Sequence, residues 1–202
     1  GFKKGLLKGD ILMNLDSEDE GELYVGCAGG IDVNIKKDYT EEKSPKGMVA
    51  YKILAKGLKG GHSGVDIAMG RANSNKIMFR FMMQAESDFG IRLAEAAGGD
   101  LRNAIQRESY SIVLLPEIKT KEFEKFIKGY EKIYQAEFSD TEPDLLFTFE
   151  KVAVPAKVMN QGEQYRIIRA LFACPNGVQR MSQAMKGLVE TSNNLAIVRC
   201  IG

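Results

Sequence analysis

Apolar residues alternate with polar ones, or form short runs, in several parts of the chain, and both patterns are typical of β-strands. Glycine, proline and acidic residues separate these runs and indicate turns. One such run is Met48 to Ala55, which predicts a strand. The same pattern predicts strands over residues 10–16, over residues 23–35 with a break at the glycines, over residues 144–154, and at least once within 188–201.

Three other stretches carry apolar residues at helical spacing. The first follows Asn73 or Ser74, either of which can cap a helix, and its apolar stripe of Ile77, Phe81, Phe89 and Leu93 runs on to Gly98 and Gly99. The second covers Thr120 to Ala136, and the third covers Gln161 to Cys174, where Pro175-Asn176-Gly177 ends it. In the second helix we expect a core-facing stripe of Phe123, Phe126, Ile127, Tyr130 and Ile133.

Between the first two helices, residues 101–115 read as two strands joined by a polar turn near Gln106 to Glu108, with Pro116 stopping the second strand. The charged segment from Asp38 to Lys46 reads as an exposed loop. Strands and helices alternate, and several strands are sequential neighbours. We therefore predict an α/β (α+β) fold with a ferredoxin-like βαββαβ antiparallel sheet, helices on one face, and extra strands and a third helix.

The composition excludes several classes of function. Lysine and arginine (28) nearly balance aspartate and glutamate (27), and no long basic run occurs, so nucleic acid is not an expected partner. No run of 18 apolar residues occurs, so no membrane partner is expected either. The first ten residues are too short and too interrupted by lysine and glycine for a signal peptide. These features predict a cytoplasmic protein.

The residues that bind metals are few. Cys27, Cys174 and Cys200 lack the spacing of a zinc motif and are an odd number, so we expect structural, reduced thiols. His62 is the chain's single histidine, and the usual two- or three-histidine zinc site cannot be built from it alone.

Four clusters are candidates for chemistry, and each has a structural alternative. The acidic run from Asp16 to Gly21 is usual for a solvated turn, although it follows a predicted strand, where α/β proteins often keep ligands. His62 lies between glycines, which let a backbone approach a ligand closely and expose the imidazole. Asn103 and Arg180, taken alone, would be ordinary surface residues.

The order of these clusters is more specific than any one of them. The run from Asn14 to Gly30 resembles the segment by which aminoacyl-histidine dipeptidases pass from catalytic domain to lid domain. Gly60-Gly61-His62-Ser63-Gly64 resembles the lid histidine loop that these enzymes share with carnosinases and related di-zinc exopeptidases. The resemblance continues in order through Arg71–Lys76, Asp100–Glu108, Pro175–Ser182 and Glu190–Leu195, so it covers essentially the whole chain.

This resemblance implies roles for four residues. Asp16 matches a carboxylate that binds one of two zinc ions. His62 matches the lid histidine that stabilises the negative charge developing on the scissile carbonyl. Asn103 matches a lid asparagine near the carboxylate of the dipeptide substrate, and Arg180 is the candidate to pair with that carboxylate. Gln106 stands where the family pattern has proline, which leaves the conformation of that turn open.

The other metal ligands and the general base of the family have no counterpart between Gly1 and Gly202. We therefore expect residues 1–30 to be a stub of the catalytic domain, residues 31–195 to be the lid and dimerisation domain, and residues 196–202 to start the return to the catalytic domain. The expected function is that of the lid of a zinc-dependent enzyme that cleaves Xaa-His dipeptides.

Such a lid would act with the remaining catalytic segments, and a homodimer could form through it. The chain alone would be inactive and would hold no zinc stably. The alternative from another class is a non-enzymatic α/β module for oligomerisation or peptide binding, with a merely solvated acidic turn. Whether His62 acts within its own subunit or in a neighbouring one stays open.

Overall fold

The computed structural model describes residues 3–6, 8–11, 13, 20–21 and 28–201. The chain divides into two units, residues 1–35 and residues 36–202. In the first unit the described residues form turns and irregular backbone, and Ile31, Val33 and Ile35 are exposed. The strand predicted over 23–35 is therefore wrong for its described part, residues 28–35. A segment with alternating apolar residues forms a strand only where another strand pairs with its backbone N–H and C=O groups. The strand predicted over 10–16 falls mostly outside the described residues.

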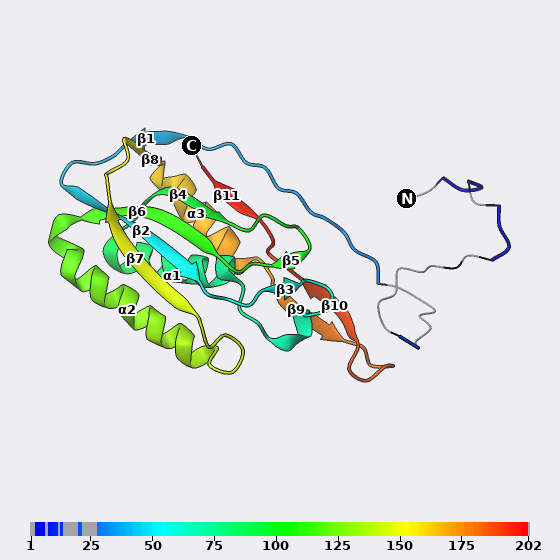
Figure 1. Cartoon of the computed structure of the whole chain (residues 1–202). Helices are drawn as coiled ribbons and strands as arrows, with labels where there is room; N and C mark the ends of the chain where they lie inside the picture. Colours follow the sequence, from blue (N-terminus) through cyan, green and yellow to red (C-terminus); the bar gives the residue numbers. More distant parts are fainter. Residues whose placement is uncertain (1–2, 7, 12, 14–19, 22–27, 202) are drawn as a thin grey trace. The chain divides into compact units, whose positions relative to one another are not determined.

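The second unit is built on a five-stranded antiparallel sheet (Figure 1). Its order is β11–β4–β6–β2–β7, where β2 is Met48–Lys56, β4 is Arg92–Gly98, β6 is Ser109–Pro116, β7 is Leu146–Val152 and β11 is Val198–Cys200. The central strand β6 pairs with β2 over eight residue pairs, from Met48 opposite Pro116 to Ala55 opposite Ser109. The sheet contains the strands predicted near 48–55 and 144–154 and the second of the two predicted within 101–115. The first of those two is the short strand Ala104–Ile105, which lies outside this sheet.

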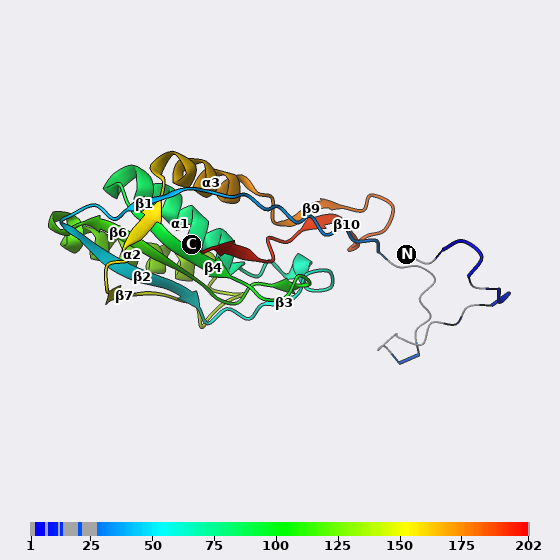
Figure 2. The same ribbon diagram turned by 90° about the horizontal axis from the view of Figure 1, so that it is seen from above.

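Three helices cover one face of this sheet (Figure 2). They are α1 (Ser74–Phe89), α2 (Thr120–Glu137) and α3 (Gln161–Ala173). The order β2-α1-β4-β6-α2-β7, with β2 and β6 at the centre of the sheet, is the ferredoxin-like βαββαβ arrangement. Strand β11 and helix α3 extend it, so the predicted fold is confirmed. None of the helices formed by described residues has the length and apolar character needed to cross a lipid bilayer.

Short strands form three further pairs. They are β1 (Glu41–Lys43) with β8 (Lys157–Met159), β3 (Gly61–His62) with β5 (Ala104–Ile105), and β9 (Gly177–Met181) with β10 (Val189–Asn193). Two 3₁₀ turns, η1 (Ile67–Met69) and η2 (Glu117–Lys119), complete the unit. Strand β1 lies in the segment predicted as a loop, so that prediction is wrong for residues 41–43. The sequence does not show this strand, because its pairing uses backbone groups and its charged side chains carry no strand pattern.

Aromatic rings fill the core between the helices and the sheet. The ring of Phe81, on α1, lies 6.1 Å from that of Phe123 and 5.3 Å from that of Tyr130, both on α2. It also lies 5.1 Å from the ring of Phe147 on β7, in an edge-to-face contact. The Tyr134 hydroxyl donates to the Ile77 carbonyl oxygen at 2.7 Å, and burial raises the pKa of this phenol. One ring of α1 thus joins both long helices to the sheet.

Two details of the helix predictions are wrong. Helix α1 ends at Phe89 because Gly90 takes a left-handed conformation, with φ 65°, and Leu93 belongs to β4 and not to the helical stripe. In α2 the residue expected inside, Ile133, is 47% exposed, and its neighbour Tyr134 is buried in its place. The buried positions Phe123, Ile127 and Tyr134 follow spacings of four and seven residues.

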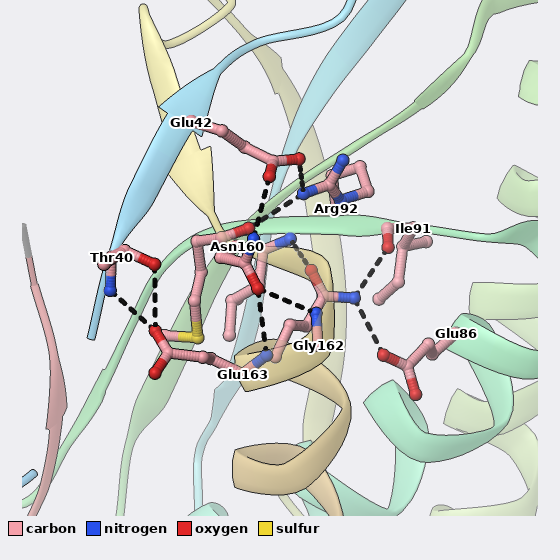
Figure 3. A network of polar contacts seen from close by, with 11 residues as sticks. Thr40, Glu42, Glu86, Ile91, Arg92, Asn160, Gly162 and Glu163 are labelled. Atoms are coloured by element: carbon pink, nitrogen blue, oxygen red, sulfur yellow. Dashed lines mark hydrogen bonds and ion pairs between the residues drawn. The ribbon is translucent and has the colours of Figure 1, made fainter.

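A polar network fixes the start of α3 against the sheet (Figure 3). The Asn160 side chain accepts from the Gly162 amide and caps the helix, and it donates to Glu42, which also pairs with Arg92 at 2.6 Å. The buried amide of Gln164 accepts from the Leu93 amide and donates to the Ile91 carbonyl and to Glu86. Helix α3 is therefore tied to β4.

Replacing Phe123 by alanine should remove the best-buried ring of α2 and lower the free energy of unfolding by about 3 to 5 kcal/mol. Ile133→Ala, on the same helix but half exposed, is the matched control and should cost under about 1 kcal/mol. Urea unfolding of the two variants measures both. Equal losses would show that the helix does not pack as described.

Candidate functional site

The predicted histidine loop, Gly60–Gly64, is held at one end of the second unit by a short strand pair. His62 lies opposite Ala104, and Gly61 lies opposite Ile105. The Ser63 amide also donates to the carbonyl oxygen of Asn103 at 2.8 Å. His62 and Asn103, which are 41 positions apart by their numbers, therefore come from adjacent segments, and both are exposed.

The imidazole of His62 is hydrogen-bonded to its own loop. Its Nδ1 atom accepts from the Gly64 amide at 3.1 Å and from the Val65 amide at 3.2 Å. A neutral imidazole that accepts at one ring nitrogen carries its proton on the other, so Nε2 is the donor. The loop thus presents an exposed N–H group.

Two glycines of the loop are required by its geometry. Gly61 has φ 140°, and a Cβ atom there would overlap the guanidinium of Arg71 and the carboxylate of Asp66. Gly60 has φ 66°, and a Cβ atom there would overlap the side chain of Arg107. The glycines that marked the loop in the sequence therefore allow close approach between segments of this chain.

The turn that carries Asn103 is supported by Gln106. This buried side chain donates to the carbonyl oxygens of Leu101, at 3.2 Å, and Ala104, at 2.7 Å. A proline at this position, as in the family pattern, has no such side-chain donor. Gln106 therefore closes the Asn103 turn by its own hydrogen bonds.

Three asparagines connect this turn to the β9–β10 hairpin. The Asn73 side chain caps α1 by accepting from the Asn75 and Lys76 amides, and it donates to the side-chain oxygens of Asn176 and Asn194. Asn194 in turn donates to the carbonyl oxygen of Ala104 at 2.6 Å. The start of α1, the base of the hairpin and the strand opposite His62 are thus one hydrogen-bonded assembly.

Arg180 projects from β9 of that hairpin. Its Nε atom lies 3.1 Å from the carboxylate of Glu190 on β10, and both side chains are roughly half exposed. Strand β9 also contacts η1, which directly follows the His62 loop. All three described candidates therefore lie at the same end of the second unit (Figure 1), although no hydrogen bond joins Arg180 to His62 or Asn103.

The fourth candidate, Asp16, lies outside the described residues. Among the residues that are described, no group of three or more histidine, cysteine, aspartate or glutamate side chains is placed to hold a metal ion. Cys174 and Cys200 are free thiols, and burial raises the pKa of Cys200 to about 11. Cys200 packs in the core, as expected for a structural thiol, whereas Cys174 is half-buried and Cys27 lies outside the described residues.

Comparison with known proteins shows what this part of the chain resembles. Residues 53–142, which include His62 and Asn103, match the family model described as a peptidase dimerisation domain. This region is similar to a peptidase dimerisation domain. The chain is also 39% identical over 198 residues to the cytosol non-specific dipeptidase of Escherichia coli K12, covering 98% of the chain and 41% of that protein.

A solved structure supports the same assignment. The crystal structure of aminoacylhistidine dipeptidase from Vibrio alginolyticus superposes with a TM-score of 0.87 at 40% identity, covering 99% of this chain and 41% of the other. The resemblance predicted from the order of motifs is therefore confirmed. The chain spans about two fifths of the length of both relatives.

Several residues that hold the candidate site in place were not predicted in that role from the sequence. Asn73 was expected only as a helix cap, and the roles of Asn176, Asn194 and Asp66 were not predicted. The carboxylate of Asp66 accepts from the His62 backbone amide at 2.8 Å and lies 3.5 Å from Arg71. Asn73, Asn176 and Asn194 fall within the motifs that carried the resemblance, whereas Asp66 does not. Long-range hydrogen bonds leave no periodic pattern that would mark such residues.

Gly61→Ala should destabilise the domain by more than about 1 kcal/mol, because the added methyl group meets Arg71 and Asp66 where φ is positive. Gly129→Ala is the matched control. It lies within α2 with nothing near its Cβ position and should stabilise by about 0.5 to 1 kcal/mol. Thermal unfolding compares the two, and a stabilised Gly61→Ala variant would contradict the loop geometry.

Proposed function

We propose that this chain is the lid and dimerisation part of a zinc-dependent dipeptidase that hydrolyses Xaa-His dipeptides. The observation that carries the proposal is the exposed Nε2 donor of His62, held on a glycine loop within a region similar to a peptidase dimerisation domain. A donor of this kind can stabilise an oxyanion that forms on a scissile carbonyl. The names of the two relatives support dipeptides as the substrate class.

Within this proposal Asn103 and Arg180 bind the carboxylate end of the dipeptide. Asn103 is exposed beside the His62 loop, so its side-chain amide can donate to a carboxylate there. Arg180 must first exchange Glu190 for the substrate. Exposed ion pairs contribute on the order of 0 to 1 kcal/mol, so this exchange costs little.

In this proposal the zinc ions are bound by the complete enzyme. The residues of this chain do not make up a zinc site by themselves. It has one histidine, and its described residues contain no cluster of metal ligands. Asp16 is proposed as one carboxylate ligand, completed by catalytic segments like those of the longer relatives. In that enzyme, residues 31–195 form the lid, residues 1–30 belong to the catalytic domain, and residues 196–202 lead back to it.

The description of the family supports a homodimer through this domain. A dimer gives His62 two routes to a scissile bond, within its own subunit or in its neighbour. The cytosolic relative supports a cytoplasmic enzyme, and the near balance of charges gives no reason to expect nucleic acid as a partner. The alternative is a non-enzymatic module for oligomerisation or peptide binding, and the effect of His62→Ala on turnover distinguishes it from a catalytic lid.

Residues 1–202 alone should show no peptidase activity, because a di-zinc site needs more ligands than the chain supplies. Release of histidine from an Xaa-His dipeptide in the presence of zinc is the assay. Calorimetry of the same sample should find no tight zinc site, and Asp16→Asn should leave the titration unchanged. Turnover, or a tight site that depends on Asp16, would contradict the assignment.

In the enzyme that carries this lid, His62→Ala should lower kcat on the order of 100 to 1,000-fold, because one donor to the oxyanion is lost. The zinc content should not change. Asn103→Ala and Arg180→Ala should mainly raise KM, because Asn103 and Arg180 hold the substrate carboxylate. Comparing an Xaa-His substrate with a dipeptide that lacks histidine tests the specificity. Normal turnover by His62→Ala would reject the role of the loop.

Mixing two inactive variants distinguishes the routes open to His62. One subunit type carries His62→Ala, and the other carries Asp16→Asn. If the histidine of one subunit serves the metal site of the other, mixed dimers recover part of the activity. If each subunit uses its own histidine, the mixture stays inactive.

A further inference from the structure

A second set of contacts, which includes an ion pair, holds the His62 loop in its conformation without touching the imidazole. The backbone amide of His62 donates to the Oδ2 atom of Asp66 at 2.8 Å, and the Asp66 amide donates back to the His62 carbonyl oxygen at 2.9 Å. Residues 62 and 66 are thus joined in both directions. The amides of Gly64 and Val65, which hold the ring, lie between these two fixed points.

Arg71 connects this set of contacts to the other side of the loop. Its Nη1 atom lies 3.5 Å from Oδ2 of Asp66 and donates to the Gly60 carbonyl oxygen at 2.5 Å. The Asp66 and Arg71 side chains are each about four fifths covered, so water screens the pair less than a fully exposed one. Charge-assisted hydrogen bonds to backbone groups are among the stronger ones in proteins.

The Asp66–Arg71 pair matters because the His62 imidazole is exposed and could rotate freely if its loop were not held. In solution a neutral histidine exchanges its proton between Nδ1 and Nε2, and only the protonated nitrogen can donate. Two amides aimed at Nδ1 exclude a proton there, because two donors would face each other. The conformation of residues 60–66 therefore decides which ring atom is presented as the donor.

We propose that Asp66, together with Arg71, is the positioning residue for His62: it closes the loop so that Nδ1 stays an acceptor and Nε2–H faces outward. The catalytic consequence rests on the proposed function, but the proton position does not. A carbonyl that develops negative charge needs a donor already in place, and a loop that must reorganise first loses rate. Asp66 would thus act on the reaction without touching the substrate.

The test uses the chain as it is, because a single histidine gives one set of ring signals. Long-range ¹H–¹⁵N correlation spectra of ¹⁵N-labelled protein, recorded well above the ordinary pKa of histidine of about 6.5, report which ring nitrogen carries the proton. A peptide with the sequence of residues 59–67 serves as the unconstrained reference. We expect the protein to show the Nε2–H form alone and the peptide to show a mixture of both forms.

Asp66→Ala should move the ring signals towards those of the peptide and raise the hydrogen exchange rates of the Gly64 and Val65 amides at least tenfold. Asp66→Asn keeps an oxygen that can accept from the His62 amide and should restore most of the wild-type spectrum. Asp140→Ala, in the exposed turn after α2, is the control and should change neither reading. Thermal unfolding confirms that each variant is folded.

A wild-type spectrum that matches the peptide, or an Asp66→Ala spectrum that matches the wild type, would overturn the positioning role. Activity separates this result from the function proposed above. In the intact enzyme, Asp66→Ala should lower kcat on the order of 10 to 100-fold with KM nearly unchanged. If the spectra change as expected while His62→Ala keeps full turnover, the positioning role stands and the catalytic role of His62 fails.

Discussion

The side chain of Asn73 makes hydrogen bonds in two directions, and the end of the domain that carries His62 depends on both. Its oxygen caps α1, and its nitrogen donates to Asn176, Asn194 and the Leu195 carbonyl. Only 3% of this residue is exposed, so losing either set would leave buried polar groups unpaired. Helix α1 is thereby joined to the segments that flank the β9–β10 hairpin.

From Asn73 the connection runs to the candidate site in two further steps. Asn194 donates to the Ala104 carbonyl, and Ala104 pairs with His62 across β5 and β3. The aromatic core holds α1 against the sheet, α1 holds the asparagines, and the asparagines hold the strand beside the histidine. Exposed residues such as His62 and Asn103 can therefore keep a defined geometry without being buried themselves.

The sequence was enough to predict the fold because the core follows simple periodic patterns. Phe123 and Ile127 lie four residues apart on α2, and the run from Met48 to Ala55 is a continuous strand. Prediction failed where pattern and packing disagree. Residues 92–98 are rich in alanine, leucine and glutamate and suggest helix, yet Gly90 ends α1 and pairing with β6 makes them a strand.

The site was predictable only in part, for a different reason. The glycines around His62 indicated an exposed loop, and the order of motifs connected it to dipeptidases. The partners that shape the loop were not visible. Asp66 and Arg71 contact it through single carboxylate and guanidinium groups, and Asn194 reaches Ala104 across 90 residues. Such contacts become evident only when the fold brings their segments together.

The central claim is that His62 reaches the scissile carbonyl through Nε2. The most direct measurement is a crystal structure of the full-length enzyme bound to a dipeptide analogue with a tetrahedral, negatively charged group in place of the scissile amide. The account predicts that His62 Nε2 lies about 2.7 to 3.1 Å from an oxygen of that group, with Nδ1 still facing the amides of residues 64 and 65. A closed, analogue-bound enzyme in which His62 points into solvent would contradict it.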